Sequence, residues 1–511
     1  MRERLVIDGR ALDPEQVVAV AQGRAEAVPA PDLAERMAPA RQLVERMWSG
    51  GEVVYGVTTG FGALVDQRIP LEESRSLQVA LLRSHAAGVG QPLPDPLVRA
   101  MLLLRARTLA QGHSGVRPLL VERYLELLRR DLLPVVPEQG SVGASGDLAQ
   151  FAHLALPLIG EGRLKDGGQA LPAAGALRRH GLEPIELEAK EGLSLLNGTE
   201  GMLAYGVLGL HRALRLARAT DVACALSVEA LLATDRAYQP EVHRLRPHPG
   251  QLASAGNLAR LLEGSEIVAS HRHDPHAVQD AYSLRCAPQV HGASRDVLAF
   301  CEQVFRRELG SVVDNPIVLP QAGEVLSAGN FHGQPLAFAL DFMAVASTGL
   351  AGISERRTDR ILDPLRSSGL SAFLAARPGL NSGYMLAQYT AAALVAESRV
   401  LCHPSSVGSI PTSGSQEDHV SMGWGSGRKM WQVLANVARV VAVEVICAVE
   451  GIEQRAFRPA PGTAAAVRVV RSAVPPLKDD RVPAGDMEAA AVLIEDGSLV
   501  EAVEEAIGPL E

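Results

Sequence analysis

The stretch KMWQVLANVARVVAVEVICAVEGIEQRAF, residues 429–457, is the feature that most constrains how this chain can fold. Its first glycine is Gly451, so a helical pattern runs through it without a break. Its apolar residues recur at helical spacing, at Met430, Val433, Leu434, Val437 and Val441. An amphipathic run of this length predicts an extended helix, which must bury its apolar face against other long helices.

Helix signals also occur in the first half of the chain. Asp13 can cap a helix that starts at Pro14, Gln16 can complete a capping box, and Gly23 ends the run. Further helices are expected over Leu33–Trp48, Leu77–Ala87, Pro96–Gln111 with Asp95 as its cap, and Arg117–Arg130.

Strand signals are few and short. In GGEVVYGVTTGFGALV, residues 50–65, glycines and β-branched residues replace helical periodicity, which indicates a loop. We therefore predict a mainly α protein in two domains. Residues 1–195 form a mixed N-terminal domain with a loop-rich region, and residues 196–511 form a central and C-terminal bundle of long helices.

Composition excludes several classes of function. Of the 511 residues, 47% are hydrophobic and 4% aromatic, so the core is expected to be aliphatic. The formal net charge is −9 without a long basic run, which argues against nucleic acid or an anionic membrane as a partner. The first residues are charged, no 18 consecutive residues are apolar, and the five cysteines form no CxxC pair. We expect a cytoplasmic protein with no membrane span and no cysteine zinc site.

GSVGASGDLAQ, residues 140–150, concentrates small residues just before an apolar helical pattern. One interpretation is structural: Ser145 or Asp147 caps a helix that starts near Leu148, and the glycines permit the turn. A second interpretation, a serine-hydrolase nucleophile, is disfavoured because the G-x-S-x-G pattern fails at Ser145.

A third interpretation is that this segment makes its own electrophile. The amide nitrogen of Gly146 can attack the carbonyl carbon of Ala144 and close a five-membered ring. Loss of water from that ring, and of the Ser145 hydroxyl, leaves an imidazolone that carries a dehydroalanine. Glycine offers an unhindered nitrogen, alanine does not crowd the carbonyl, and the flanking glycines permit the strained backbone.

The same stretch is one of eight motifs that point to a known family. In chain order they are YGVTTGFG (55–62), SHAAGVG (84–90), GSVGASGDLA (140–149), LLNGT (195–199), VQDAYSLRC (278–286), DNP (314–316), GNFHGQP (329–335) and SQEDHVSMG (415–423). With them, the chain resembles the aromatic amino acid ammonia-lyase and aminomutase family over most of its length. The resemblance implies a fumarase-like helical fold and a 4-methylidene-imidazol-5-one (MIO) group, formed autocatalytically from Ala144, Ser145 and Gly146. It implies no metal and no other organic cofactor.

The resemblance also assigns roles to residues outside the tripeptide. Tyr55 matches the catalytic base that takes the β-proton, and the glycines after it, including Gly62, match a loop that closes over substrate. Arg285 matches the group that binds the substrate carboxylate, for which a planar guanidinium is suited. The remaining matches touch the ring, the amine or the carboxylate, or line the ring pocket: Tyr282, Asn197, Asn315, Gln279 and Phe331.

His85 and Glu417 carry the expectation about substrate. A phenylalanine pocket needs apolar surface at its ring end, whereas a histidine pocket needs a hydrogen-bonding partner and an acidic group for the imidazole. The motifs SHAAGVG, with His85, and SQEDHVSMG, with Glu417, have the form found in histidine-acting members of the family. Those members convert L-histidine to trans-urocanate and ammonia as the first step of histidine degradation. Glu417 discriminates better than His85, because tyrosine-acting relatives can also carry the histidine.

Two alternatives stay open at the level of sequence. The first is the same ring with another outcome, in a phenylalanine or tyrosine lyase or an aminomutase. The second is a non-catalytic helical homologue whose tripeptide never cyclises.

The resemblance implies a homotetramer with active sites shared between subunits. HRHDPH, with His271, His273 and His276, lacks the spacing of a zinc motif and is interpreted as a polar surface loop.

Overall fold

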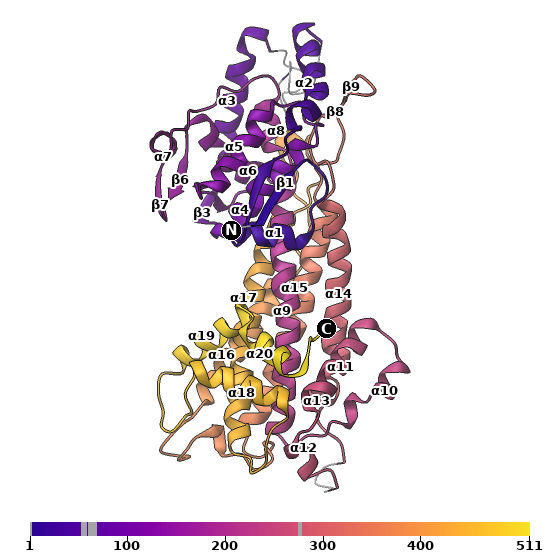
Figure 1. Ribbon diagram of the computed structural model, residues 1–511, viewed down its shortest axis with the longest axis vertical. Helices are drawn as coiled ribbons and strands as arrows, with labels where there is room; N and C mark the ends of the chain where they lie inside the picture. The colour runs from indigo at the N-terminus through magenta and orange to yellow at the C-terminus, as the bar shows by residue number, and fades with distance from the viewer. Residues whose placement is uncertain (1–2, 53–58, 60–68, 274–277) are drawn as a thin grey trace. The chain divides into compact units, whose positions relative to one another are not determined.

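The computed structural model describes residues 3–52, 59, 69–273 and 278–511 (Figure 1). The chain forms two compact units. Unit 1 comprises residues 1–208, 302–341 and 404–428, and unit 2 comprises residues 209–301, 342–403 and 429–511. The domain boundary at residue 195 expected from the sequence stays a prediction.

Unit 1 combines short helices with small sheets. Its helices up to residue 196 are α1 (Pro14–Ala21), α2 (Leu33–Ser49), α3 (Ser74–His85), α4 (Asp95–Ala110), α5 (Pro118–Arg129), α6 (Leu148–Ala155), α7 (Ala173–Arg179) and α8 (Glu191–Leu196). The strands β1 (Glu3–Ile7) and β2 (Ala25–Pro29) pair in parallel. The antiparallel pairs are β3 (Val89–Pro92) with β5 (Pro137–Gln139), β4 (Leu133–Pro134) with β6 (Arg163–Asp166), β6 with β7 (Gln169–Pro172), and β8 (Ile317–Leu319) with β9 (Glu324–Leu326).

Long helices dominate the rest of the described chain, so the predicted mainly α fold is confirmed. The division between the units falls inside α9 (Glu200–Ala230), α14 (Ala287–Glu308), α15 (Gln334–Leu362) and α17 (Gly423–Glu453). The other helices of unit 2 are α10 (Pro240–Arg244), α11 (Pro249–Leu262), α12 (Glu266–Ser270), α13 (Tyr282–Arg285), α16 (Met385–Leu401), α18 (Pro461–Ala473), α19 (Pro483–Glu495) and α20 (Ser498–Ile507).

Helix α17 contains the apolar run from which the fold was predicted, and the five apolar residues of its pattern are fully buried. It begins earlier than the pattern indicated, at Gly423. The glycines of its first turns allow close packing: a Cβ on Gly423 would lie 2.5 Å from Met202 Sδ, and one on Gly427 would lie 3.0 Å from the Tyr205 ring. These glycines therefore serve helix packing and do not end the helix.

The N-terminal helices follow the predicted ranges with small shifts. In α1 the Gln16 side chain accepts a hydrogen bond from the Asp13 N–H at 3.0 Å, as a capping box requires. The expectation that Asp95 caps α4 is wrong. Pro94 occupies the cap position, and the Asp95 carboxylate forms an ion pair with Lys165.

Among the described residues, α15 and α17 have the length and hydropathy of membrane-spanning helices. In their most apolar stretches, however, 67% and 83% of the residues are buried inside the protein. Burial of this kind is typical of core helices in a globular protein, which must be apolar around much of their circumference.

We predict that Leu434→Ala in α17 lowers the free energy of unfolding by about 2–5 kcal/mol, because it leaves a cavity in a packed core. Denaturant titration followed by circular dichroism measures the change. Leu245→Ala is the matched control, since Leu245 is 88% exposed, and it should leave the transition within about 0.5 kcal/mol of the original. Equal transitions for the two variants would contradict the assignment of α17 to the core.

Candidate active site

The tripeptide Ala144–Ser145–Gly146 lies in unit 1 immediately before α6. Its backbone is bent unusually: Ser145 has φ +48° and Gly146 has φ +83°. A left-handed conformation at a serine is uncommon and costs free energy, so the surrounding structure must hold it.

The main chain of Gly198, in the turn between α8 and α9, packs directly on the bend. The Gly198 N–H donates to the Ser145 carbonyl at 3.2 Å, and the Asp147 N–H donates to the Gly198 carbonyl at 2.8 Å. A Cβ on Gly146 would lie only 1.9 Å from the Gly198 carbonyl oxygen. Both the backbone angle and the contact therefore require glycine at position 146.

Asp147 follows the tripeptide and is fully buried. Helix α6 begins at Leu148, as predicted, but the Asp147 carboxylate does not cap it. It accepts a hydrogen bond from the Met202 N–H at 2.9 Å, at the start of α9. Burial raises the pKa of Asp147 well above its usual range, against the opposing effect of that N–H. Asp147 thus occupies the N-cap position of α6, as the structural interpretation allowed, but its carboxylate makes no capping hydrogen bond.

Asn197 and Asn315 are brought together from distant parts of the sequence. The buried Asn197 amide donates to the Asn315 carbonyl at 2.7 Å. The Asn315 side-chain oxygen accepts hydrogen bonds from the Ala328 N–H at 2.8 Å and the Ser327 hydroxyl at 3.2 Å. These contacts leave the Asn315 NH₂ group as the part of that side chain that can meet a ligand oxygen.

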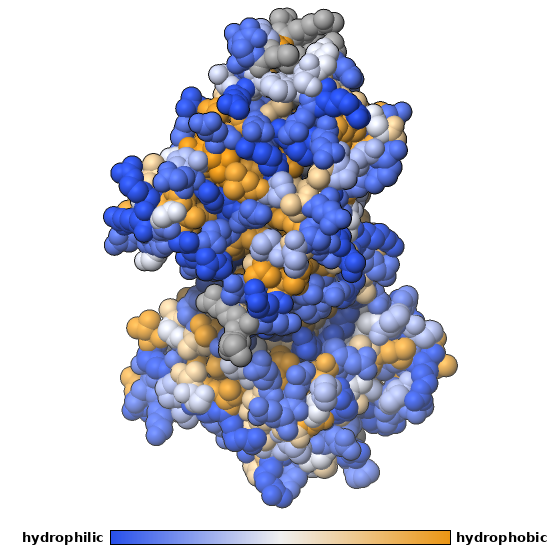
Figure 2. Space-filling model, turned by 45° about the horizontal axis from the view of Figure 1, so that its top comes forward, coloured by the Kyte–Doolittle hydropathy of each residue, from blue (hydrophilic) through white to orange (hydrophobic). Residues whose placement is uncertain are grey.

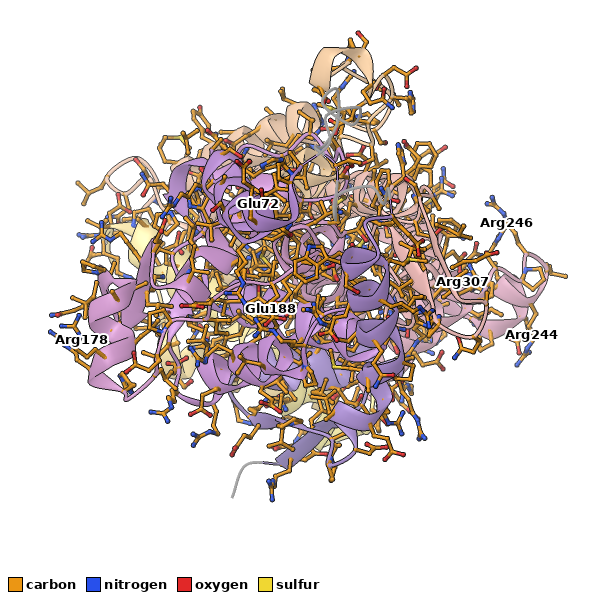
Figure 3. All side chains as sticks on the ribbon, turned by 90° about the horizontal axis from the view of Figure 1, so that it is seen from above. Glu72, Arg178, Glu188, Arg244, Arg246 and Arg307 are labelled. Atoms are coloured by element: carbon orange, nitrogen blue, oxygen red, sulfur yellow. The ribbon has the colours of Figure 1, made fainter. Side chains whose placement is uncertain are left out.

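A network of ion pairs fixes the start of α8, and thus the turn that follows it. The fully buried Glu191 pairs with Arg117 at 2.7 Å, and Glu188 pairs with Arg41 at 2.6 Å. Figure 3 shows Glu188 among the helices of unit 1, whereas Arg178, on α7, points outward.

His85 is the last residue of α3, and its ring orientation is fixed by the helix. Nδ1 lies 2.9 Å from the Leu81 carbonyl oxygen, which can only accept a hydrogen bond. Ser84 Oγ also lies 3.1 Å from Nδ1, but its proton is donated to the same Leu81 carbonyl. These contacts favour the tautomer in which Nδ1 carries the proton and Nε2 is the acceptor. Burial lowers the pKa of His85, and the nearby charge of Glu417 opposes the shift.

Glu417 is held by a short closed loop. Its backbone exchanges two hydrogen bonds with Thr412, at 3.0 and 3.3 Å, and the Thr412 hydroxyl donates to Glu417 Oε2 at 2.7 Å. One carboxylate oxygen is thus occupied by Thr412, and among the described residues no hydrogen bond is made to the other. Phe331 is half-buried, and the next residue, His332, bonds the His419 carbonyl at 3.2 Å, two residues beyond Glu417.

Three expected site residues belong to unit 2. Arg285 ends α13; its guanidinium lies 4.6 Å from the centre of the Tyr282 ring, and its Nε donates to the Asp280 carbonyl at 2.9 Å. Tyr282 is 71% exposed, and Gln279 is also exposed.

Tyr55 and Gly62 lie outside the described residues, as does His276. In the part of the chain that the structure describes, no group of three or more His, Cys, Asp or Glu side chains is placed to hold a metal ion.

Sequence reasoning missed three residues that shape this region. Thr412, which orients Glu417, carried only a weak signal, the small residues SGS that allow the chain to turn back. Gly198, which pairs with the bend, lies inside the motif LLNGT, but sequence reasoning gave it no role of its own. Arg105, a charged residue in the apolar run MLLLRARTLA, had a clear signal, because a charge in such a helix must find a partner.

A family model described as aromatic amino acid lyase matches residues 12–472. A curated histidine ammonia-lyase from Gloeobacter violaceus is 52% identical over 508 residues, which are 99% of this chain and 99% of the relative.

Two solved structures share the fold and much of the sequence. The crystal structure of histidine ammonia-lyase from Trypanosoma cruzi is 41% identical with a TM-score of 0.91, and covers 99% of this chain and 96% of that one. Tyrosine aminomutase from Streptomyces globisporus is 37% identical with a TM-score of 0.93, and covers 99% and 100%. By sequence and by fold, this chain belongs to the aromatic amino acid lyase family.

Proposed function

We propose that this protein catalyses the non-oxidative deamination of L-histidine to trans-urocanate and ammonia. The observation that carries the proposal is the pair His85 and Glu417, an imidazole acceptor and a carboxylate in the same unit as the tripeptide. The curated relatives at about half identity are named histidine ammonia-lyase, which supports the same substrate.

The chemical difficulty of this reaction lies in its two bonds to carbon. The β-proton is only weakly acidic, and a free amine is a poor leaving group. An MIO group made from Ala144, Ser145 and Gly146 would supply an electrophile that turns the amine into a better leaving group. The residues present fit such a group: position 146 admits only glycine, and Ser145 already lies in a bend.

At the imidazole end, His85 Nε2 accepts a hydrogen bond from a ring N–H of the substrate. The Glu417 carboxylate oxygen that Thr412 does not occupy accepts a second hydrogen bond or stabilises positive charge on the ring. A phenyl ring offers no donor to either group, so binding phenylalanine would leave a half-buried carboxylate without a partner. This difference is the physical basis of the proposed selectivity.

At the amino acid end, Arg285 and the Asn315 amide bind the carboxylate, and Asn197 and Tyr282 meet the amine or the ring. Tyr55 removes the β-proton, Gly62 belongs to the loop beside it, and Gln279 and Phe331 line the ring pocket. The support for these roles is the match of each residue to its family motif.

We also propose a cytoplasmic homotetramer whose subunits share their active sites. Apolar side chains exposed on unit 2 support self-association: Phe300, Phe342 and Val345 are each nearly half exposed, and the two phenylalanine rings lie 6.0 Å apart. Figure 2 shows apolar residues at the surface in patches between hydrophilic ones. Burying such patches between copies is favourable. The five free cysteines are compatible with a reducing compartment.

An amino acid panel tests the substrate. Purified protein is incubated separately with L-histidine, L-phenylalanine and L-tyrosine, and the products are identified by mass spectrometry. We expect urocanate and ammonia in equal amounts from histidine. Cinnamate or coumarate as the main product would replace the proposal with a phenylalanine or tyrosine lyase, and a β-amino acid would replace it with an aminomutase. No product from any substrate would favour a non-catalytic homologue.

We predict that Glu417→Gln lowers kcat/KM for histidine roughly 10- to 100-fold, since a hydrogen bond to a charged group contributes about 1.5–3 kcal/mol. Steady-state production of urocanate measures the change. Glu324→Gln, at an exposed position on β9 in the same unit, is the matched control and should keep the original activity. Near-original activity of Glu417→Gln would remove Glu417 from the imidazole site.

The pH dependence follows from the direction of the His85 shift. Burial lowers this pKa below its ordinary value of 6.5. The ring therefore stays mostly neutral, and able to accept a hydrogen bond, at pH 6.5 and above. We predict that loss of kcat/KM through His85 protonation occurs only below pH 6.5 and is absent in His85→Gln, which does not titrate. An acid-side loss centred above 6.5 that disappears in His85→Gln would contradict this prediction.

A further inference from the structure

Arg105, on α4, is a fully buried cation that the proposed chemistry does not use. It pairs with the equally buried Glu200 at 2.9 and 3.1 Å. Its two terminal nitrogens also donate to the Asn197 carbonyl, at 2.5 and 2.6 Å, and one donates to the Ser194 carbonyl at 3.0 Å. These carbonyls lie at the C-terminal end of α8, where a helix leaves acceptors without partners.

The ion pair reaches the tripeptide through one glycine. A Cβ on Gly198 would lie 2.1 Å from Glu200 Oε2 and 2.3 Å from Arg105 Nη1, so the pair packs against the Gly198 Cα. Gly198 in turn forms hydrogen bonds with Ser145 and Asp147, which are the residues on either side of Gly146. A continuous set of contacts thus runs from Arg105 to the bend.

A purely structural role explains these contacts poorly. Apolar residues of similar volume often stabilise a core as well as a buried ion pair does, because the ion pair must offset the desolvation of both charges. An apolar side chain at position 105 could not donate to the Asn197 and Ser194 carbonyls, which fix the turn that carries Gly198. What Arg105 supplies is the position of that turn.

We propose that Arg105, paired with Glu200, is a positioning residue for closure of the ring at Ala144–Ser145–Gly146. The inference rests on the proposed function, because it concerns formation of the proposed MIO group. In the closure, a bond forms between the Gly146 nitrogen and the Ala144 carbonyl carbon, and the amide proton moves to the carbonyl oxygen.

The remaining steps need no oxidant or reductant. The new hydroxyl leaves as water with the Ser145 amide proton, which makes a C=N bond. The Ser145 side-chain hydroxyl leaves as a second water with the α-proton, which makes a C=C bond. The barrier lies in bringing the nitrogen and the carbonyl carbon together, and a displacement of about 1 Å can slow such a reaction about 10²-fold.

The test follows maturation by intact mass, independently of activity. Full-length wild-type protein and Arg105→Lys are sampled at intervals after a short pulse of synthesis, and the loss of two waters is timed. Lysine keeps the charge opposite Glu200 but has a single nitrogen, which cannot hold both carbonyls in a planar fork. We expect Arg105→Lys to close the ring about 10²-fold more slowly than wild type.

Three controls separate the possible causes. Arg357→Lys breaks a matched pair in unit 2, where Arg357 and Glu444 are both fully buried, and it should mature at the wild-type rate. Ser145→Ala cannot lose both waters and marks the mass of an incomplete ring. Glu200→Gln, which preserves volume and weakens the pairing, should also slow closure and decides the matter where Arg105→Lys is insoluble.

The outcomes distinguish this inference from the proposed function. If Arg105→Lys loses the two waters at the wild-type rate, the role of Arg105 is overturned. Where Arg105→Lys is insoluble, a wild-type rate in Glu200→Gln overturns it. Equal slowing in Arg357→Lys also overturns it, because general stability would then set the rate. Wild-type protein that never loses two waters overturns the MIO group itself.

Discussion

The two hydrogen bonds between Gly198 and the residues flanking Gly146 are the constraint on which the rest of the site depends. They hold a serine and a glycine with positive φ in succession, which an unsupported chain would not keep. Helix α6 leaves from this bend, α8 ends beside it and α9 begins beside it. The buried Asp147 ties the bend to α9 as well, through the Met202 N–H.

The two groups proposed to recognise the substrate ring are prepared in different ways. The Leu81 carbonyl orients the His85 ring, and burial lowers the pKa of that ring, so His85 is positioned before any ligand arrives. Glu417 is oriented by a loop of its own, through Thr412, which occupies one carboxylate oxygen. Because both groups are preorganised, little of the binding free energy is lost in ordering them.

The sequence predicted features that depend on local pattern, and failed where distant groups compete. The apolar period of α17 and the start of α6 at Leu148 were legible, because spacing and small residues decide them. Asp95 was expected to cap α4, and Ser145 or Asp147 to cap α6. The Asp95 carboxylate instead pairs with Lys165, and Asp147, although at the N-cap position, accepts from Met202. A cap is a local option that a long-range partner can displace, and the sequence does not show the partner.

For the candidate site too, the sequence indicated local motifs and did not indicate long-range partners. The motifs identified the tripeptide, and they also singled out His85 and Glu417, which the fold brings within electrostatic range of each other. Thr412 was given no role because its hydrogen bond to Glu417 depends on how the loop folds. Gly198 was given none, although it lies in LLNGT, because its partners are backbone groups of a distant segment. Arg105 was visible as a charge in an apolar helix, but its partner, ninety-five positions away, was not.

The meeting of α4, α6, α8 and α9 around one bend determines when, during folding, the proposed ring could form. Its contacts join segments far apart in the chain, so they exist only after those helices have assembled. Under the proposed ring closure, a newly made polypeptide would begin without the electrophile and would gain it only after these helices had assembled. Misassembled copies would then lack the reactive group, and the mass of each molecule would record whether it had once folded correctly.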